Sequence, residues 1–235
     1  MPHAEACRQA AVISPCPPSH TPHEGLMSTT PSMIFIVDDD ADIREALTGQ
    51  LNSADYAVTS FASPADFLAA SVPDVPACVL VDVHMPGMSG FDLQAALAGR
   101  GRVLPLIFMT AFGTIPMTVR AMKAGALEFL TKPIAEDDLL WAIETALARD
   151  AEQIRSNAAN ADAKRRYATL TPREKETFAL AIGGLMNKQM ATELGISEVT
   201  AKVHKRQVME KMGARSLPDL VLFAEQLDIV AAKKR

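Results

Sequence analysis

The sequence has few cysteines and no long apolar run. It contains three cysteines among 235 residues, and two of them, Cys7 and Cys16, lie near the N-terminus. So few cysteines, without paired spacing, exclude a disulfide framework and fit a reducing compartment. No stretch approaches the roughly 18 consecutive apolar residues that a membrane-spanning helix needs. We therefore expect a cytoplasmic protein that has no membrane partner.

Residues 1–32 have little apolar periodicity and hold six of the chain's fifteen prolines. This composition predicts a disordered leader. It is not typical of a signal peptide, because the apolar stretch from Ala10 to Ile13 is short and lacks a basic lead. Met27 precedes the first predicted strand by a few residues and is a candidate natural start, which the mass of the native N-terminus would test.

The net charge of −5 combines two halves of opposite sign. Acidic residues outnumber basic ones by 16 to 7 over residues 33–150, whereas basic residues outnumber acidic ones by 14 to 8 over residues 164–235. An acidic half followed by a basic half predicts an input domain and a nucleic-acid-binding domain. Ordinary variation between two solvated domains would give the same contrast, so the motifs must decide.

Residues 33–149 alternate between short apolar runs and segments with helical spacing. The runs at 33–37, 56–61, 77–82, 104–109 and 126–130 are typical of buried strands. Helical patterns occupy 42–53, a segment from Pro64, 91–98, 115–124 and 136–149. This strict alternation predicts a doubly wound α/β fold with a five-stranded parallel sheet. Trp141, in the last of these helices, is expected to be a packing residue.

Polar side chains follow four of the predicted strands. Because the carboxyl ends of parallel strands meet at one edge of a sheet, we expect these side chains to lie close together. A lone strand-end Asp more often caps a turn, but clustered carboxylates repel one another unless a cation lies among them. Oxygen ligands without Cys or His favour Mg²⁺ over zinc. The side chains are Asp38, Asp39 and Asp40 after the first strand, Asp82 after the third, Thr110 after the fourth and Lys132 after the fifth.

This combination is suited to accepting a phosphoryl group. Asp82 can attack phosphorus, while a metal ion and Lys132 neutralise the equatorial oxygens and the Thr110 hydroxyl donates to one of them. The sequence assigns no role to the additional Asp40.

At these residues the chain resembles the receiver domains of two-component response regulators, which have a flavodoxin-like fold. The resemblance covers about Met33 to Leu147 and rests on Asp38-Asp39, Asp82 followed by MPGMSG, Thr110-Ala111 and Lys132-Pro133. It implies that Asp82 is the phosphoacceptor of a cognate histidine kinase. It further implies that Mg²⁺ is held by Asp38, Asp39, Asp82 and the backbone carbonyl of His84, that Thr110 and Lys132 bind the phosphoryl oxygens, and that Phe129 swings inward when Thr110 moves.

The remainder of the chain is predicted to be a linker and an all-α domain. Residues 150–167 are Ala-rich and charged, as in a helical or semi-flexible linker. The boundaries that we expect are a leader at 1–32, a receiver at 33–149, this linker, and a four-helix domain at 168–235. Its predicted helices run from a capping box at Thr171 to Ile182, from Asn187 to Leu194, from Glu198 to Met212 and from Leu217 to Leu227. A short helix, a turn and a longer basic helix predict a helix-turn-helix.

The third of these helices is the predicted DNA-binding helix. Its apolar residues mostly follow the spacing of a helix packed on one side; they are Val199, Val203, Val208 and Met212. Lys202, Lys205 and Arg206 occupy much of the other surface, where they could neutralise phosphates or donate to guanine. A solubilising charged face would look the same.

The second domain resembles the LuxR-type DNA-binding domain over about Ala168 to Glu225. The matching segments are TPRE from Thr171, Gly184-Leu185, NKQMA from Asn187 and ISEVTAKVH from Ile196. Together with the receiver they make the chain similar to the FixJ/NarL group of transcriptional regulators. The resemblance implies that Lys202, Val203, Lys205 and Arg206 face DNA and that Asn187, Lys188 and Thr200 approach its backbone. Met186 departs from the Ser or Thr usual in the family and is expected to weaken a helix cap.

We therefore expect a phosphorylation-switched transcription factor and not an enzyme, apart from its own phosphoryl transfer and dephosphorylation. The resemblance implies homodimerisation through the fourth helix, fifth strand and fifth helix, followed by binding to double-stranded DNA, with RNA polymerase as a further partner. Two alternatives stay open: a phosphatase with an Asp nucleophile, although His84 stands where a second Asp is usual, and a structural dimerisation module that binds DNA independently of phosphate.

Overall fold

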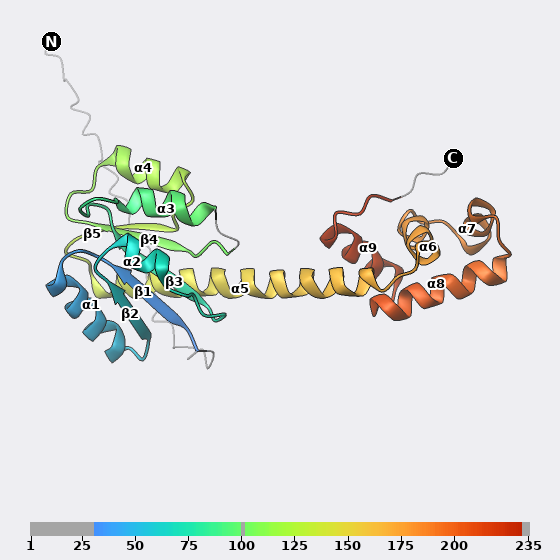
Figure 1. Cartoon of the computed structure of the whole chain (residues 1–235), viewed down its shortest axis with the longest axis horizontal. Coiled ribbons are helices and arrows are strands. Elements are labelled where there is room, and N and C mark those ends of the chain that lie inside the picture. Colours follow the sequence, from blue (N-terminus) through green and yellow to red (C-terminus); the bar gives the residue numbers. More distant parts are fainter. Residues whose placement is uncertain (1–30, 100–101, 232–235) are drawn as a thin grey trace, which may run out of the picture.

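The computed structural model describes residues 31–99 and 102–231, so the leader predicted at 1–32 lies almost wholly outside the described residues. An α/β domain lies at one end of a long helix and an all-α domain at the other (Figure 1). Within the described residues, no helix is long and apolar enough to cross a membrane.

The first domain is built on the predicted five-stranded parallel sheet. Its strands lie in the order β2-β1-β3-β4-β5. Val37 pairs with Phe61 and Val81, Asp82 pairs with Met109, and Thr110 pairs with Thr131, so the strand ends meet at one edge. The strands are β1 (Met33–Val37), β2 (Ala57–Phe61), β3 (Ala77–Asp82), β4 (Leu106–Thr110) and β5 (Glu128–Thr131).

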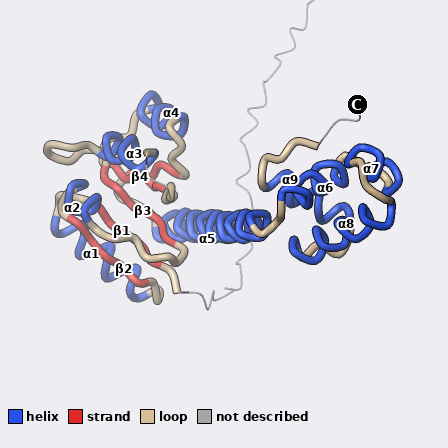
Figure 2. Tube along the Cα trace, turned by 45° about the vertical axis from the view of Figure 1, so that its right-hand side comes forward, coloured by secondary structure: helices blue, strands red, loops and turns tan. Residues whose placement is uncertain are grey.

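Helices cover both faces of the sheet, which therefore has two apolar cores (Figure 2). Alternate residues of β1 point to opposite faces, Phe35 into one core and Ile34 into the other. The first core is closed by α2 (Pro64–Ala69), α3 (Gly90–Ala98) and α4 (Ile115–Lys123), and the second by α1 (Ala41–Ser53) and α5 (Glu136–Ala168).

Helix α5 is much longer than the sequence analysis predicted. It was expected to end at Arg149, but it continues without a break to Ala168, through the predicted linker. Neither Gly nor Pro occurs between Glu136 and Ala168, and the stretch is rich in alanine, so nothing in the local sequence ends the helix. Trp141 on this helix is 58% exposed, so the prediction that it is a packing residue is wrong.

The second domain packs four helices around one core. They are α6 (Pro172–Ile182), α7 (Asn187–Leu194), α8 (Glu198–Met212) and α9 (Leu217–Gln226). The capping box predicted at Thr171 and Glu174 is present. Gly195 and Gly213 adopt positive φ and end α7 and α8, as left-handed C-cap glycines do. Tyr167 at the end of α5 meets the Phe178 ring edge-on at 5.4 Å, so the long helix contributes to this core.

Candidate functional sites

Three charged side chains from different strand ends meet at the carboxyl edge of the sheet. Lys132 follows β5, and its Nζ donates to Asp38 Oδ2 and to Asp82 Oδ1, both at 2.7 Å. Asp38 is 1% exposed and Asp82 is 7% exposed. The sequence analysis expected these residues to meet, and they do. One ammonium thus holds together two carboxylates that would otherwise repel each other.

The protonation of this cluster depends on burial and on the ion pairs. Burial raises the pKa of Asp38 above its usual range, although the hydrogen bond from Lys132 opposes the shift. The pKa of Lys132 is also raised, because the hydrogen bonds to Asp38 and Asp82 outweigh the opposing effect of desolvation. Lys132 therefore stays charged at neutral pH, and its positive charge is fixed beside the Asp82 carboxylate.

The local backbone also holds Asp82 in place. The backbone N–H of His84 donates to Asp82 Oδ2 at 2.6 Å. Gly90, the first residue of α3, lies directly against the Asp82 carbonyl, and a Cβ at this position would overlap that oxygen and touch the Phe108 ring. This close approach explains the glycine that ends the MPGMSG sequence, because only glycine lets the helix begin so near the strand.

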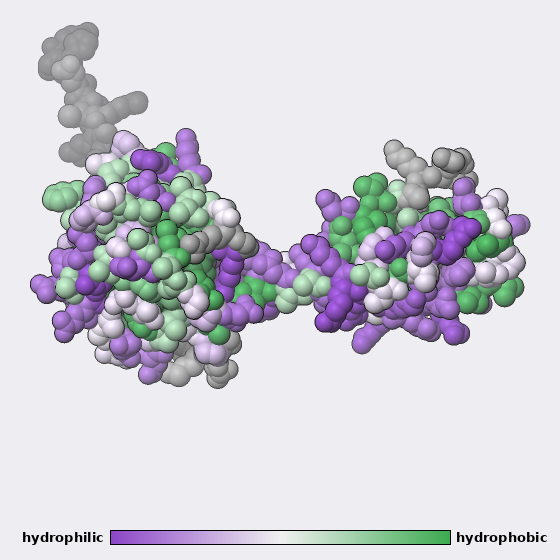
Figure 3. Space-filling model, viewed as in Figure 1, coloured by the Kyte–Doolittle hydropathy of each residue, from purple (hydrophilic) through white to green (hydrophobic). Residues whose placement is uncertain are grey.

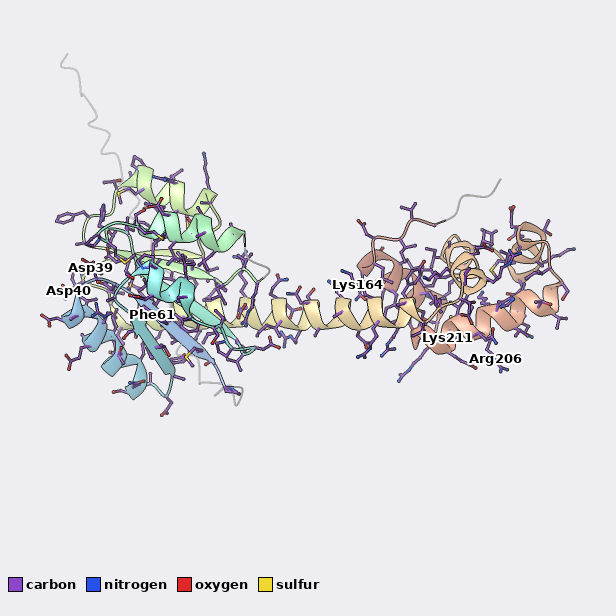
Figure 4. All side chains as sticks on the ribbon, in the orientation of Figure 1. Asp39, Asp40, Phe61, Lys164, Arg206 and Lys211 are labelled. Carbon is purple, nitrogen blue, oxygen red and sulfur yellow. The ribbon has the colours of Figure 1, made fainter. Side chains whose placement is uncertain are left out.

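The cluster lines a hollow of about 290 Å³ that opens to solvent. Asp39 and Asp40 lie at its rim, beside the start of α1 (Figure 4). Asp40, which the sequence left without a role, is the N-cap of α1: its Oδ1 accepts from the N–H groups of Asp42 and Ile43. A capping signal was present, since an Asp directly preceding a helical pattern is a preferred N-cap.

The donor set of this hollow fits Mg²⁺. In the described part of the chain, no three His, Cys, Asp or Glu side chains enclose a metal ion on their own. Magnesium does not need such an enclosure, because it keeps several waters and takes one or two carboxylates. Asp38, Asp39 and Asp82 offer carboxylate oxygens around the hollow, with no softer ligand than the exposed His84 ring beside them.

The Thr110 hydroxyl faces the loop between β4 and α4. It accepts from the N–H of Phe112 at 3.2 Å and lies 3.4 Å from His84 Nδ1. Gly113, in this loop, lies close to both Thr110 and Phe129, the aromatic residue that the resemblance implies swings inward. A Cβ on Gly113 would lie 3.2 Å from the Phe129 ring and 3.6 Å from the Thr110 methyl. Thr110, Gly113 and Phe129 are therefore packed together, and a movement of one changes the space available to the others.

A buried ion pair that the sequence analysis missed lies at the opposite end of the sheet. Asp150 on α5 is 1% exposed, pairs with Arg102 and accepts from the N–H of Ala77 at 2.8 Å. Arg102 also donates to the carbonyls of Pro73 and Val75. The sequence analysis treated Asp150 as the first linker residue. It lies inside the first domain, and because its partners are 48 and 73 residues away, no local signal could reveal them.

In the second domain, the outward face of α8 includes valines that the apolar spacing had placed in the core. Ala201, Val208 and Met212 are buried, whereas Val199 is 75% exposed and Val203 is 48% exposed. The expectation from apolar spacing that Val199 and Val203 pack inward is therefore wrong. Lys202 and Arg206 are exposed on the same side as these valines, and Lys205 is half-buried at the flank.

The residues predicted to approach the DNA backbone lie near the starts of α7 and α8. Lys188 and Thr200 are exposed, and Asn187 is half-buried with its Oδ1 unpaired among the described residues. Met186 offers no side-chain oxygen to cap α7, as the sequence analysis anticipated. Gln189 compensates in part, because its Oε1 accepts from the Met186 N–H at 2.9 Å.

Together, the fold and the two sites define a receiver domain joined to a helix-turn-helix domain, and comparisons with known proteins agree. The family of response regulator receiver domains matches residues 34–144. The luxR family of bacterial regulatory proteins matches residues 168–224. The two matches correspond to the two halves of opposite charge.

Full-length relatives have the same combination. The chain is 43% identical over 204 residues to nodulation protein W of Bradyrhizobium diazoefficiens, a match that covers 87% of this chain and 90% of the relative. It is 42% identical to the transcriptional regulatory protein FixJ of Azorhizobium caulinodans, covering 81% and 90%. Among solved structures, the response regulator StyR is 45% identical with a TM-score of 0.74, covering 83% of this chain and 99% of that one.

The chain therefore belongs to the two-component response regulators of the FixJ type, which carry a receiver domain and a LuxR-type DNA-binding domain. It is a transcription regulator of that family and not a classical enzyme. The receiver implies a histidine kinase as a partner, and the second domain implies DNA binding.

Proposed function

We propose that Asp82 accepts a phosphoryl group from a partner histidine kinase. The observation that carries this proposal is the contact of Lys132 Nζ with both Asp82 and Asp38 in a hollow open to solvent. An Asp82 oxygen attacks the phosphorus of the kinase phosphohistidine, the P–O bond forms as the P–N bond breaks, and the imidazole leaves with the electron pair.

The chain's own residues prepare this step. The fixed charge of Lys132 stabilises the negative charge that the phosphoryl oxygens carry in the transition state. The His84 N–H orients the Asp82 carboxylate from the other side. Asp38 and Asp39, with Asp82 and the His84 carbonyl, are the residues that would hold Mg²⁺. When bound, that ion neutralises charge on the transferring group.

The switch would proceed from Thr110 to Phe129. On phosphorylation, the Thr110 hydroxyl gives up its hydrogen bond with the Phe112 N–H and donates to a phosphoryl oxygen. Because Thr110, Gly113 and Phe129 are packed together, this rearrangement moves the loop before α4 and draws the Phe129 ring inward. The result is a change in the surface made by α4, β5 and α5.

That surface carries an apolar stripe suited to dimerisation. Ile115, Val119 and Met122 are spaced four and three residues apart on α4, and all three are exposed. Phe112, in the loop before the helix, is exposed as well. Contiguous exposed apolar residues of this kind mark interaction sites, and a two-fold dimer would cover them with their own copy. Dimerisation then brings two copies of α8 to two half-sites on double-stranded DNA.

The intact mass of the protein tests the chemistry. Wild type and Asp82→Ala are incubated with Mg²⁺ and acetyl phosphate, and mass spectrometry measures the intact mass of each before and after hydroxylamine treatment. We expect one phosphoryl group on the wild type alone, removed by hydroxylamine as an acyl phosphate is. A phosphoryl group on both proteins would place the modification elsewhere and overturn the proposal.

A further inference from the structure

Helix α5 carries the orientation of the receiver to the second domain without a hinge. Leu139 and Ile143 anchor its first half in the receiver core, and the buried Asp150 pairs with Arg102 at the end of the sheet opposite the hollow. From there it continues as one helix to Ala168, with neither Gly nor Pro. Figure 3 shows a narrow waist between the two domains at this helix. The receiver and the end of α5 are therefore expected to move together, because the helix contains none of the usual causes of a kink.

The last turn of α5 meets the last turn of α8. Arg166 of α5 donates from Nη1 to the carbonyl of Met212, the last residue of α8, at 3.0 Å. In return, Lys211 of α8 donates from Nζ to the carbonyl of Thr169, the C-cap of α5, at 3.5 Å. The C-terminus of a helix carries unsatisfied carbonyls and a partial negative charge, so each helix end attracts the cation of the other helix. The two helices thus cap one another.

Neighbouring residues hold the Arg166 guanidinium at this place. Its Nε pairs with Asp162 Oδ2, one turn earlier on α5, at 2.6 Å. Gly213 leaves the space that the guanidinium occupies, because a Cβ there would overlap Arg166 Nη1. Met212 is fully buried in the core of the second domain, so its carbonyl is a fixed acceptor. A planar guanidinium that is held by both helices restricts the angle between them.

We propose that Arg166 and Lys211 fix the orientation of α8 relative to α5, so that the receiver dimer sets the half-site spacing that the protein accepts. The inference rests on the proposed dimerisation of the receivers and the proposed binding of α8 to DNA. Two receivers in a symmetric dimer hold two α5 helices in one arrangement. Because each α8 is joined rigidly to its α5, the distance and the rotation between the two α8 helices are fixed as well.

The geometry of DNA makes this rigidity measurable. Half-sites one helical turn apart are about 10 base pairs from centre to centre, so each inserted base pair rotates one half-site by about 35° around the duplex axis. A rigid dimer then loses simultaneous contact with both half-sites, and the advantage of two-site binding disappears. A dimer with a flexible joint between α5 and α8 would tolerate the same insertion.

The test measures affinity for duplexes of altered spacing. The full-length protein, with Mg²⁺ and acetyl phosphate, first selects sites from a random duplex pool, and two base pairs are then inserted between the half-sites of a selected duplex. For the wild type we expect the insertion to lower affinity by about 100-fold, the lower range of the advantage that two linked sites provide. For Arg166→Ala we expect a loss that is smaller by about tenfold, a typical size for a coupling between two sites.

Arg165→Ala is the matched control. Arg165 is the adjacent residue and pairs with the same Asp162, but this ion pair stays within α5, so the variant should keep the spacing selectivity of the wild type. Arg166→Lys leaves a cation near the Met212 carbonyl without the planar fork that also holds Asp162, so its selectivity should lie between those of the wild type and Arg166→Ala. Circular dichroism verifies the helix content of each variant, and Arg166→Lys replaces Arg166→Ala in the comparison if the alanine variant does not fold.

A contact that only stabilised the second domain would give a different result. Arg166→Ala would then lower affinity by the same factor at every spacing. That result, wild-type spacing selectivity in Arg166→Ala, or equal tolerance in Arg165→Ala overturns the inference and leaves phosphorylation and DNA binding intact. Selected sequences without two half-sites overturn the dimer proposal and the inference with it. A pool from which no sequence is enriched overturns the DNA-binding proposal itself.

Discussion

The receiver and the outward face of α8 use their charged residues in opposite ways. In the receiver, the important charges are buried and paired: Lys132 joins Asp38 and Asp82 at one end of the sheet, and Arg102 joins Asp150 at the other. On α8, Lys202 and Arg206 are exposed, and the ion pair between Arg206 (labelled in Figure 4) and Glu210 is exposed to solvent.

This contrast follows from what each charge has to do. A fixed charge removed from water interacts strongly with a reacting group, and its pairing prevents the cost of an isolated buried ion. Charges that neutralise DNA phosphates must instead remain free until the DNA arrives. Substitutions in the receiver pairs should therefore affect folding or chemistry strongly, and substitutions on α8 should affect folding little.

The largest loss of stability is expected for Asp150→Ala. It leaves Arg102 partly buried without its counterion and removes the acceptor of the Ala77 N–H. We expect a loss of about 3–5 kcal/mol, as for other broken buried pairs. Urea unfolding followed by the fluorescence of Trp141, the chain's single tryptophan, measures it. The control is Asp137→Ala, an exposed acidic residue on the same helix, and equal stability of the two variants would contradict the role of the pair.

Lys132→Ala should abolish most phosphorylation. It removes the charge that faces the incoming phosphoryl group, and losing one such electrostatic contact typically lowers a rate by about 100- to 1,000-fold. The rate of acyl phosphate formation from acetyl phosphate measures this. Lys123→Ala, at an exposed lysine near the end of α4, is the control. A rate within threefold of the control would rule out Lys132 as an electrostatic catalyst.

A substitution at Gly113 should separate phosphorylation from the switch. In Gly113→Ala, the new methyl group would lie 2.8 Å from Thr131 Cγ2 and 3.2 Å from the Phe129 ring. We expect phosphorylation at a normal rate, with phosphate-stimulated dimerisation reduced, because the Phe129 ring loses the space it needs to move. Light scattering with and without acetyl phosphate measures it. If this variant dimerised as the wild type does, movement of Phe129 would not be required for the switch.

In the described part of the second domain, Lys211 and Glu174 form a buried ion pair, which makes the stability of the domain depend on pH. The hydrogen bond from Lys211 to Glu174, at 2.6 Å, holds the pKa of this carboxyl below its usual 4.5. A depressed folded-state pKa means that the pair stabilises the domain above pH 4.5 and that the contribution is lost as the pH falls through the folded value. The protection factors of α6 and α8 amides against hydrogen exchange should fall over that range in the wild type, and they should fall less in Glu174→Gln.

The smallest effect on stability is expected on the solvent-exposed side of α8. Arg206→Ala breaks only an exposed i, i+4 pair with Glu210, so thermal stability should change by no more than about 0.5 kcal/mol. Affinity for a duplex that the wild type selects from a random pool should fall nonetheless. A large loss of stability here would remove the contrast between the two domains.

Much of the fold and of the receiver site could be predicted from the sequence. Apolar runs followed by Asp82, Thr110 and Lys132 were sufficient, because parallel strands bring their carboxyl ends to one edge regardless of the details of packing. The capping box at Thr171 marked the start of a helix for a similar reason, because capping is a local backbone requirement.

The predictions that failed depended on distant contacts. Whether Val199 faces the core or solvent depends on how α8 is rotated against α6 and α7, and apolar spacing alone did not determine that rotation. The exposure of Trp141 depends on which side of α5 meets the sheet. Asp150 was assigned to a linker because its partners, Arg102 and the Ala77 backbone, are far away in the sequence.

We propose that phosphorylation of Asp82 controls DNA binding. The most direct test is the affinity of wild type and Asp82→Asn for a duplex that the full-length protein has selected from a random pool, each measured with Mg²⁺ in the presence and absence of acetyl phosphate. We predict that acetyl phosphate tightens binding of the wild type by about tenfold, a typical allosteric coupling, and leaves Asp82→Asn unchanged. Equal affinities of the wild type with and without the phosphodonor, after the intact mass has confirmed the modification, would show that phosphorylation does not control DNA binding.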